Sequence, residues 1–160
     1  MKKNNKGFSL VELIIVIAIM AILAGALAPA LIKYIAKSRQ STDVQNADTL
    51  RTSVQTSLAN PDAADASSVK TSGIKAASTF ISKTGDEFQK EMASQMGNNS
   101  VKIKYQSKAT GAPTSGDDMY ISIDVANNTV TVYADKGGKF ELSPNACEDW
   151  GGAKVAKKSE

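Results

Sequence analysis

Residues 7 to 32 read GFSLVELIIVIAIMAILAGALAPALI. From Leu13 to Ile32 there are twenty residues without a charge, about the number needed to cross the hydrocarbon core of a bilayer as a helix. Backbone polar groups in hydrocarbon must be paired within the segment, which an α-helix achieves. We therefore expect residues 8 to 32 to be membrane-inserted at some stage.

The length of the apolar run argues against a cleaved secretory signal, and Glu12 argues against a plain signal anchor. A cleaved secretory signal has an apolar stretch of roughly 7 to 15 residues before its cut site. This run is longer, and Ala28 is followed by Pro29, which we expect to hinder cleavage there. A plain signal anchor does not explain Glu12, because acids at membrane depth are costly and usually functional.

The composition of the 160 residues excludes several classes of function. The chain has no histidine and one cysteine, Cys147, so it cannot assemble a Ser-His-Asp or Cys-His catalytic set. We expect no enzyme activity and no cofactor. Without residues 1 to 7, which hold three lysines, sixteen basic side chains face sixteen acidic ones. DNA stays open as a partner but receives no support from the net charge.

The segment from Lys6 to Leu13, Lys-Gly-Phe-Ser-Leu-Val-Glu-Leu, resembles the class III signal of type IV prepilins and of the pseudopilins of type II secretion. The resemblance covers about residues 1 to 35. It implies that a prepilin peptidase cuts between Gly7 and Phe8 and methylates the new amino terminus of Phe8. The seven-residue leader and the Phe at the new terminus resemble the type IVa branch.

The resemblance implies that Phe8 and Glu12 direct subunit assembly, and physical chemistry gives a reason. After cleavage the Phe8 amine is a positive charge about one helical turn from the Glu12 carboxylate. Glu12 of one copy would pair with the amine of a neighbour, which removes the cost of a lone charge among apolar side chains. Head-to-tail contacts of this kind do not close, so they build a filament.

Gly25 and Pro29 are the weakest point of the predicted helix. Pro29 lacks the amide that would bond the Gly25 carbonyl, and its ring crowds that carbonyl. Two interpretations stay open. One is a mild kink; the other, implied by the resemblance, is a stretch that melts on assembly.

Beyond the apolar run the sequence predicts an α+β head. We expect the long helix to continue to Leu58, with an apolar stripe that faces the head. Residues 62 to 73 suggest a linker, and a second helix is expected from Ala77 to Met96, ending at Gly97. Alternation then predicts a small antiparallel sheet. Its strands are expected at Val101 to Tyr105, Tyr120 to Val125, Thr129 to Tyr133 and Lys139 to Leu142, with turns at Asn127-Asn128 and Gly137-Gly138.

The head offers few candidate sites. We expect no metal site; the weak calcium candidates are Asp117, Asp118 and Asp135, whose spacing fits no EF-hand and favours solvated turn carboxylates. Cys147 cannot form an internal disulfide, so it is expected to be a small buried hydrophobe rather than a reactive thiol. Many pilins staple their last loop with a disulfide. Here packing or an ion must hold that loop, with Trp150 as the expected anchor.

These inferences give four predicted regions: leader 1–7, filament-core or transmembrane half 8–32, amphipathic half 33–60 and head 61–160. The favoured function is a structural subunit of a type IV pilus. The expected partners are copies of the chain, prepilin peptidase, the pilus assembly machinery and membrane lipid. We expect a single-pass protein of the cytoplasmic membrane with its head outside, then an extracellular filament. The alternatives are a type II secretion pseudopilin, a competence pilus subunit, or a signal-anchored binding domain whose Gly7-Phe8 match is accidental.

Overall fold

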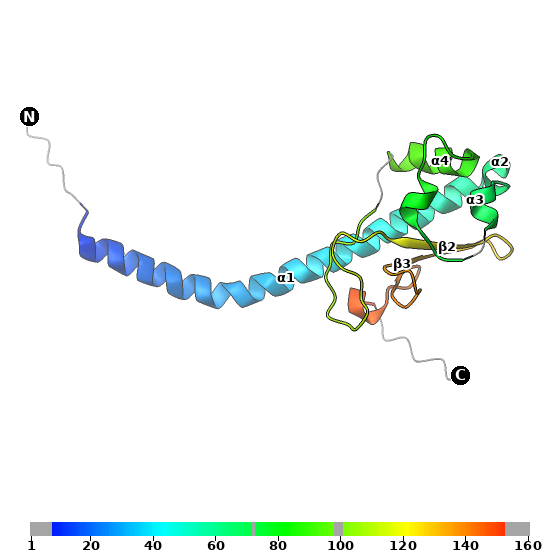
Figure 1. Cartoon of the computed structure of the whole chain (residues 1–160). Coiled ribbons are helices and arrows are strands. Elements are labelled where there is room, and N and C mark those ends of the chain that lie inside the picture. The colour runs from blue at the N-terminus through cyan, green and yellow to red at the C-terminus, as the bar shows by residue number, and fades with distance from the viewer. Residues whose placement is uncertain (1–7, 72, 98–100, 153–160) are drawn as a thin grey trace, which may run out of the picture. The chain divides into compact units, whose positions relative to one another are not determined.

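A computed structural model describes residues 8–71, 73–97 and 101–152. The chain divides into two compact units, Met1–Ala36 and Lys37–Glu160, and helix α1 (Leu10–Leu58) contributes to both. The second unit adds short helices and a four-stranded antiparallel sheet (Figure 1). The predicted α+β class, with a long amino-terminal helix and a small sheet, is confirmed.

Helix α1 begins and ends close to where the sequence predicts. At its start the Glu12 side chain accepts a hydrogen bond from the Ser9 amide at 2.9 Å, as in half of a capping box. Pro29 lies inside the helix, which continues through it. After Leu58 the Asn60 side chain accepts a bond from the Asp62 amide and caps the next helix.

The predicted linker at residues 62 to 73 is wrong, because it contains two short helices. They are α2 (Pro61–Ala64) and α3 (Ser67–Lys70). Ala63 of α2, Val69 of α3 and Ala66, the N-cap residue of α3, are buried in the head core.

The predicted second helix is shorter than expected. The chain forms a 3₁₀ turn, η1 (Ala77–Phe80), and then α4 (Glu87–Met96). Asp86 explains the late start of α4: its side chain accepts the Gln89 amide, and the Gln89 side chain accepts the Asp86 amide, forming a capping box. Gly97 ends α4 in the left-handed conformation, as predicted.

The sheet has the order β1-β2-β3-β4, with neighbours antiparallel. The predicted hairpin and last strand are confirmed with small shifts, and the turn residues Asn128 and Gly138 have positive φ. The two-residue strand β1 escaped prediction because it is too short to show a pattern. The strand bounds are Lys75–Ala76 for β1, Tyr120–Asp124 for β2, Thr129–Tyr133 for β3 and Glu141–Ser143 for β4.

The predicted strand from Val101 to Tyr105 is wrong. Only an isolated bridge between Lys102 and Asp118 is found within this segment. The amides of Lys104 and Tyr105 instead donate to a side chain of α1, Asp43, so the backbone bonds that would build a ladder are used elsewhere.

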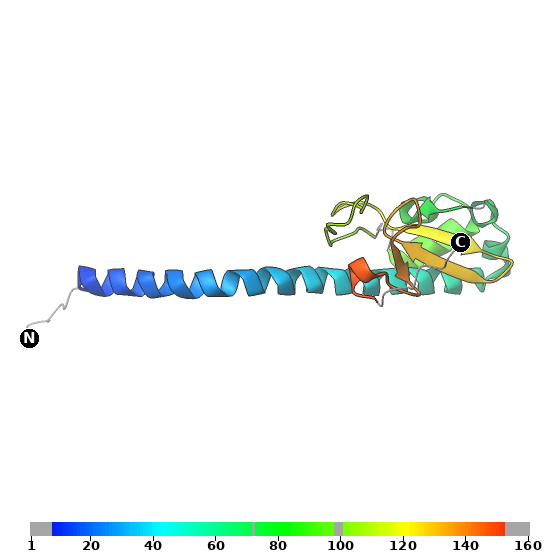
Figure 2. The same cartoon turned by 90° about the horizontal axis from the view of Figure 1, so that it is seen from below.

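The head core forms around the last turns of α1. Ala47, Leu50 and Val54 of the predicted stripe are fully buried, while Val44 and Leu58 are partly buried. Within this unit the sheet and the short helices gather about that part of the helix (Figure 2). The apolar stripe therefore organises the second unit, as the three- and four-residue spacing indicates.

Asp86 gives a stability prediction, because it caps two helices. Its carboxylate also accepts the Ser68 amide at 2.9 Å. Burial raises the pKa of Asp86, but hydrogen bonds from Ser68 and Gln89 outweigh burial, so its pKa lies below the ordinary value. The contribution of this group to stability is thus present above about pH 4 and is lost as the pH falls through the folded-state pKa.

We expect Asp86→Ala to lower the free energy of unfolding by about 1–2 kcal/mol. Asp86→Asn keeps an acceptor for the caps, so it should lose less stability but remove this pH dependence. Urea denaturation of the full chain in detergent between pH 3 and 7 would measure both effects. An Asp86→Asn profile that parallels the wild type over this range would contradict the assignment.

Candidate functional site

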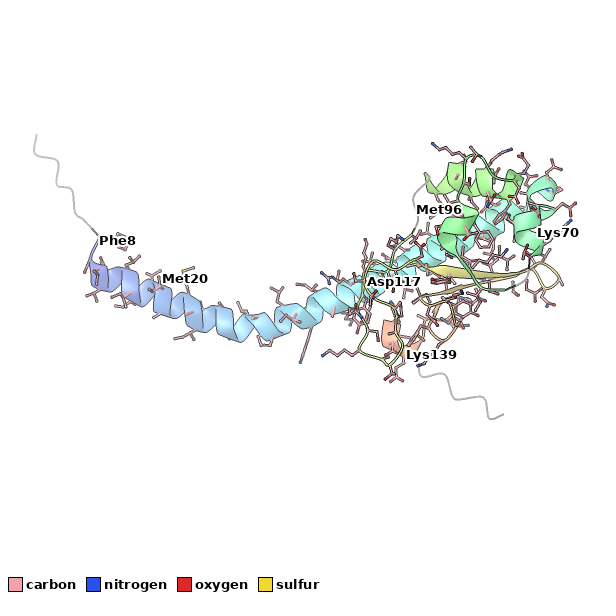
Figure 3. All side chains as sticks on the ribbon, viewed as in Figure 1. Phe8, Met20, Lys70, Met96, Asp117 and Lys139 are labelled. Atoms are coloured by element: carbon pink, nitrogen blue, oxygen red, sulfur yellow. The ribbon has the colours of Figure 1, made fainter. Side chains whose placement is uncertain are left out.

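The described residues of the first unit present an exposed apolar surface. Its large side chains from Phe8 to Ile35 are 44% to 82% exposed. Phe8 and Met20 project outward from the ribbon in Figure 3. Among the described residues, α1 is the one helix long and apolar enough to cross a membrane. Exposed apolar area of this extent marks a surface that is covered by lipid or protein.

Phe8 and Glu12 lie at the start of this surface, whereas Gly7 lies outside the described residues. Phe8 is 82% exposed. Glu12 is exposed and uses Oε2 to accept the Ser9 amide. A carboxylate accepts several hydrogen bonds, so this contact leaves capacity for a cationic donor from outside the chain.

Gly25 and Pro29 lie within unbroken helix. A side chain built at Gly25 would meet no atom within 4 Å, so the glycine is not required by a close contact within the chain. Pro29 still leaves the Gly25 carbonyl without its helical donor. The site of predicted weakness is therefore helical in the isolated chain, and its behaviour in a filament stays a prediction.

The three calcium candidates each serve their own part of the head. Asp117 accepts bonds from the amide and hydroxyl of Thr114, and Asp135 accepts the amides of Gly137 and Phe140. Asp118 accepts the Ser78 hydroxyl and forms an ion pair with Lys102.

Burial raises the pKa of Asp118, but the hydrogen bonds from Lys102 and Ser78 and the charge of Lys102 bring that pKa below its ordinary value. Within the described part of the chain, no three metal-ligating side chains come together. The structure thus gives these carboxylates structural roles.

Asp43 is the polar residue that the sequence analysis missed. It is fully buried, and its carboxylate accepts the amides of Lys104 and Tyr105 at 2.8 Å each and the Trp150 indole N–H at 3.3 Å. Three donors offset much of the cost of burying the charge. The sequence position of Asp43 could have indicated this role. Asp43 lies four residues before Ala47, on the buried stripe, where an apolar residue is expected.

Trp150 is the predicted anchor of the last loop, and this role is confirmed. It is 2% exposed and packs edge-on against Tyr105, with ring centroids 5.6 Å apart. Two more bonds join this region to α1: the Gln40 side chain donates to the Asp149 carbonyl, and the Ser143 hydroxyl donates to Asp48. Packing and hydrogen bonds therefore hold the chain as far as the described residues extend.

Cys147 is a free, half-buried cysteine. Burial raises the pKa of its thiol, and hydrogen bonds from neighbouring amides do not overcome that effect. The thiolate, which is the reactive form, is therefore disfavoured at neutral pH. This agrees with the prediction of a packing role.

We expect Asp43→Ala to destabilise the head by roughly 2–4 kcal/mol, because it leaves three N–H groups without their acceptor. Hydrogen exchange should accelerate at the Lys104 and Tyr105 amides, and Trp150 fluorescence should shift towards that of exposed tryptophan. Asp48→Ala on the same helix is the control, since it removes one hydroxyl contact only. Equal effects of the two variants on the Lys104 amide would show that Asp43 does not organise this region.

Comparisons with known proteins agree with the resemblance of the amino terminus. A family model described as the prokaryotic N-terminal methylation motif matches residues 2–28. A type IV major fimbrial protein FimA of Dichelobacter nodosus is 34% identical over 141 residues, which cover 84% of this chain and 83% of that protein. No solved structure matches the chain.

Other relatives match more closely over a shorter stretch. A second FimA protein of Dichelobacter nodosus is 42% identical over 65 residues, 41% of each chain. A fimbrial protein of Moraxella nonliquefaciens is 48% identical over 56 residues, 35% of this chain and 36% of that one. In these two matches the chain spans less than half the length of the relative. The match along most of the FimA chain, together with the methylation motif, shows that this chain belongs to the type IV pilin family, whose members are structural subunits and not enzymes.

Proposed function

We propose that the chain is the precursor of a pilus subunit that assembles through its amino-terminal helix into a cell-surface filament. The observation that carries the proposal is the contrast between the two units. Among the described residues, the head buries or partly buries its large apolar side chains except Val125, whereas the first unit exposes all of them from Phe8 to Ile32. Lipid covers that surface before assembly, and the helices of other copies cover it afterwards.

Processing precedes assembly in this proposal. Prepilin peptidase removes residues 1–7, and the new Phe8 amine is methylated. Residues 8–32 then hold the subunit in the cytoplasmic membrane, and residues 33–60 support the head, residues 61–160, on the outer side. The family-model match to residues 2–28 supports the methylation step. The assembly machinery then moves the subunit from lipid into the filament.

Glu12 selects the position of each incoming subunit. In the isolated chain it contacts only its own Ser9 amide among the hydrogen bonds described at the start of α1. A neighbouring Phe8 ammonium is a stronger partner than a neutral amide, because both members of that pair are charged. In an apolar bundle, the copy that satisfies both charges is favoured over any copy shifted along the helix axis.

The names of the relatives favour a pilus over a secretion piston. The proteins similar to this chain are called type IV major fimbrial protein or fimbrial protein. A pseudopilin of type II secretion or a competence pilus subunit would use the same Gly7, Phe8 and Glu12 chemistry. Filaments on the surface of the producing cell support the pilus, and loss of protein secretion on deletion supports the piston.

We expect Glu12→Gln to abolish the charge pairing while it keeps an acceptor for the Ser9 amide. The variant should still be inserted and processed, and surface filaments should fall at least about tenfold, since a buried charge loses its partner. Electron microscopy and intact mass measure the two effects. Glu87→Gln, at the exposed start of α4, is a control for loss of one negative charge.

Glu12→Ala tests whether the helix cap also contributes to assembly, because it removes both the charge and the acceptor for the Ser9 amide. It should be no better at assembly than Glu12→Gln. Filament numbers equal to the wild type in either variant would rule out Glu12 as the selecting charge.

A further inference from the structure

The charges that follow the apolar run are all of one sign. Between Glu12 and Asp43 the chain has three side chains that are charged at neutral pH, Lys33, Lys37 and Arg39, and no Asp or Glu. All three are exposed, and the ion pairs formed between described residues involve other side chains. We call residues 33–39 the basic segment. The nearest acid is Asp43, four residues after Arg39, and its buried carboxylate accepts N–H groups of the head.

Tyr34 gives a second, independent indication of the environment. It directly follows Lys33 and is 73% exposed. Tyrosine has an apolar ring and a polar tip, and lysine has an apolar stem and a charged tip. Both therefore favour the level of lipid headgroups at the edge of a bilayer.

The spacing between the charges fits a bilayer. Leu13 to Ile32 is twenty residues, about 30 Å of helix at 1.5 Å per residue. This equals the thickness of a typical hydrocarbon core. When Lys33 lies at one edge of the hydrocarbon, Glu12 therefore lies near the other edge, where its charge costs less than at the centre but still favours a cationic partner.

We propose that the basic segment binds anionic phospholipid headgroups and thereby fixes the depth of α1 in the membrane. The proposal rests on the membrane step of the proposed function and adds the lipid class and the residues that recognise it. Each basic side chain near an anionic surface strengthens binding by about fivefold. The recognition is the same in either leaflet, because it depends on the net negative charge of the headgroup and not on orientation.

The depth set in this way has a consequence for assembly. A helix free to slide by one turn would carry Glu12 about 5 Å into hydrocarbon or away from it. A fixed depth instead presents Phe8 and Glu12 of every subunit at one level. Subunits waiting in the membrane are then already aligned for the charge pairing that selects their position.

The test uses the full chain in nanodiscs of phosphatidylcholine with a minor share of phosphatidylglycerol. The protein is released from the nanodiscs together with the lipid that it holds tightly. Native mass spectrometry then counts the phosphatidylglycerol molecules that it retains. The wild type should retain more phosphatidylglycerol than its share of the bilayer. In the combined variant Lys33→Gln, Lys37→Gln and Arg39→Gln, the retained share of phosphatidylglycerol should fall to its share of the bilayer.

The matched control removes three exposed basic side chains from the head: Lys104→Gln, Lys108→Gln and Lys136→Gln. It changes the net charge by the same amount and should keep the enrichment. Equal enrichment in the wild type and the basic-segment variant would overturn the anchor while leaving the pilus function intact. A wild-type chain that does not enter the bilayer would overturn the membrane step itself, and the anchor with it.

Discussion

The apolar side chains of the first unit cannot be left in water, and the rest of the account depends on this constraint. Each Å² of apolar surface removed from water contributes about 25 cal/mol. The large side chains from Phe8 to Ile32 remain exposed in the isolated chain, so their burial is available to whatever surrounds the helix. A membrane and a bundle of identical helices are both suitable surroundings. A filament subunit passes from the first to the second.

The attraction between apolar surfaces has no preferred direction. We propose that the charges at the two ends of the apolar run fix the position of the helix along its axis. Hydrophobic contact alone allows helices to slide past one another, because lipid and neighbouring helices are equally apolar. Glu12 at one end and the basic segment at the other are costly to bury, and in the proposed function they limit how far the helix slides along the membrane normal. In the proposed function the apolar run supplies the affinity, and its two charged ends supply the register.

The head shows how a domain without a disulfide holds its last loop. Three side chains of α1 form hydrogen bonds with segments about a hundred residues away in the sequence. Gln40 is a donor, and Asp43 and Asp48 are acceptors. Asp43 is costly to bury, but its three N–H donors come from two different segments, so a single carboxylate fixes both against the helix. Trp150 adds the apolar contact that completes this attachment.

The sequence predicted the features that rest on local pattern. Spacing and turn residues predicted four features: the apolar run, the hairpin, the end of α4 at Gly97, and the stripe of Ala47, Leu50 and Val54. The errors came from contacts between distant segments. Asp43 accepts the amides of Lys104 and Tyr105, so these amides do not pair with a strand. About sixty residues separate Asp43 from them, and no local pattern indicates such a contact. The helices α2 and α3 were missed because four residues are too few to show a period.

The candidate site residues Phe8 and Glu12 were named from the sequence for a different reason, and their roles stay predictions. Phe8 and Glu12 belong to a short motif whose chemistry can be stated without a structure, whereas the roles of Asp86 and Asp43 depend on which amides the fold brings to them.

The most direct test of the central claim is the intact mass of the protein isolated from its native cell, with sequencing of its amino terminus. The account predicts a chain that begins at Phe8 and carries one added methyl group. Gly7→Ala should leave the chain uncut. A wild-type chain that keeps residues 1–7, or one that is cut after Ala28, would contradict the account and leave a signal-anchored or secreted domain.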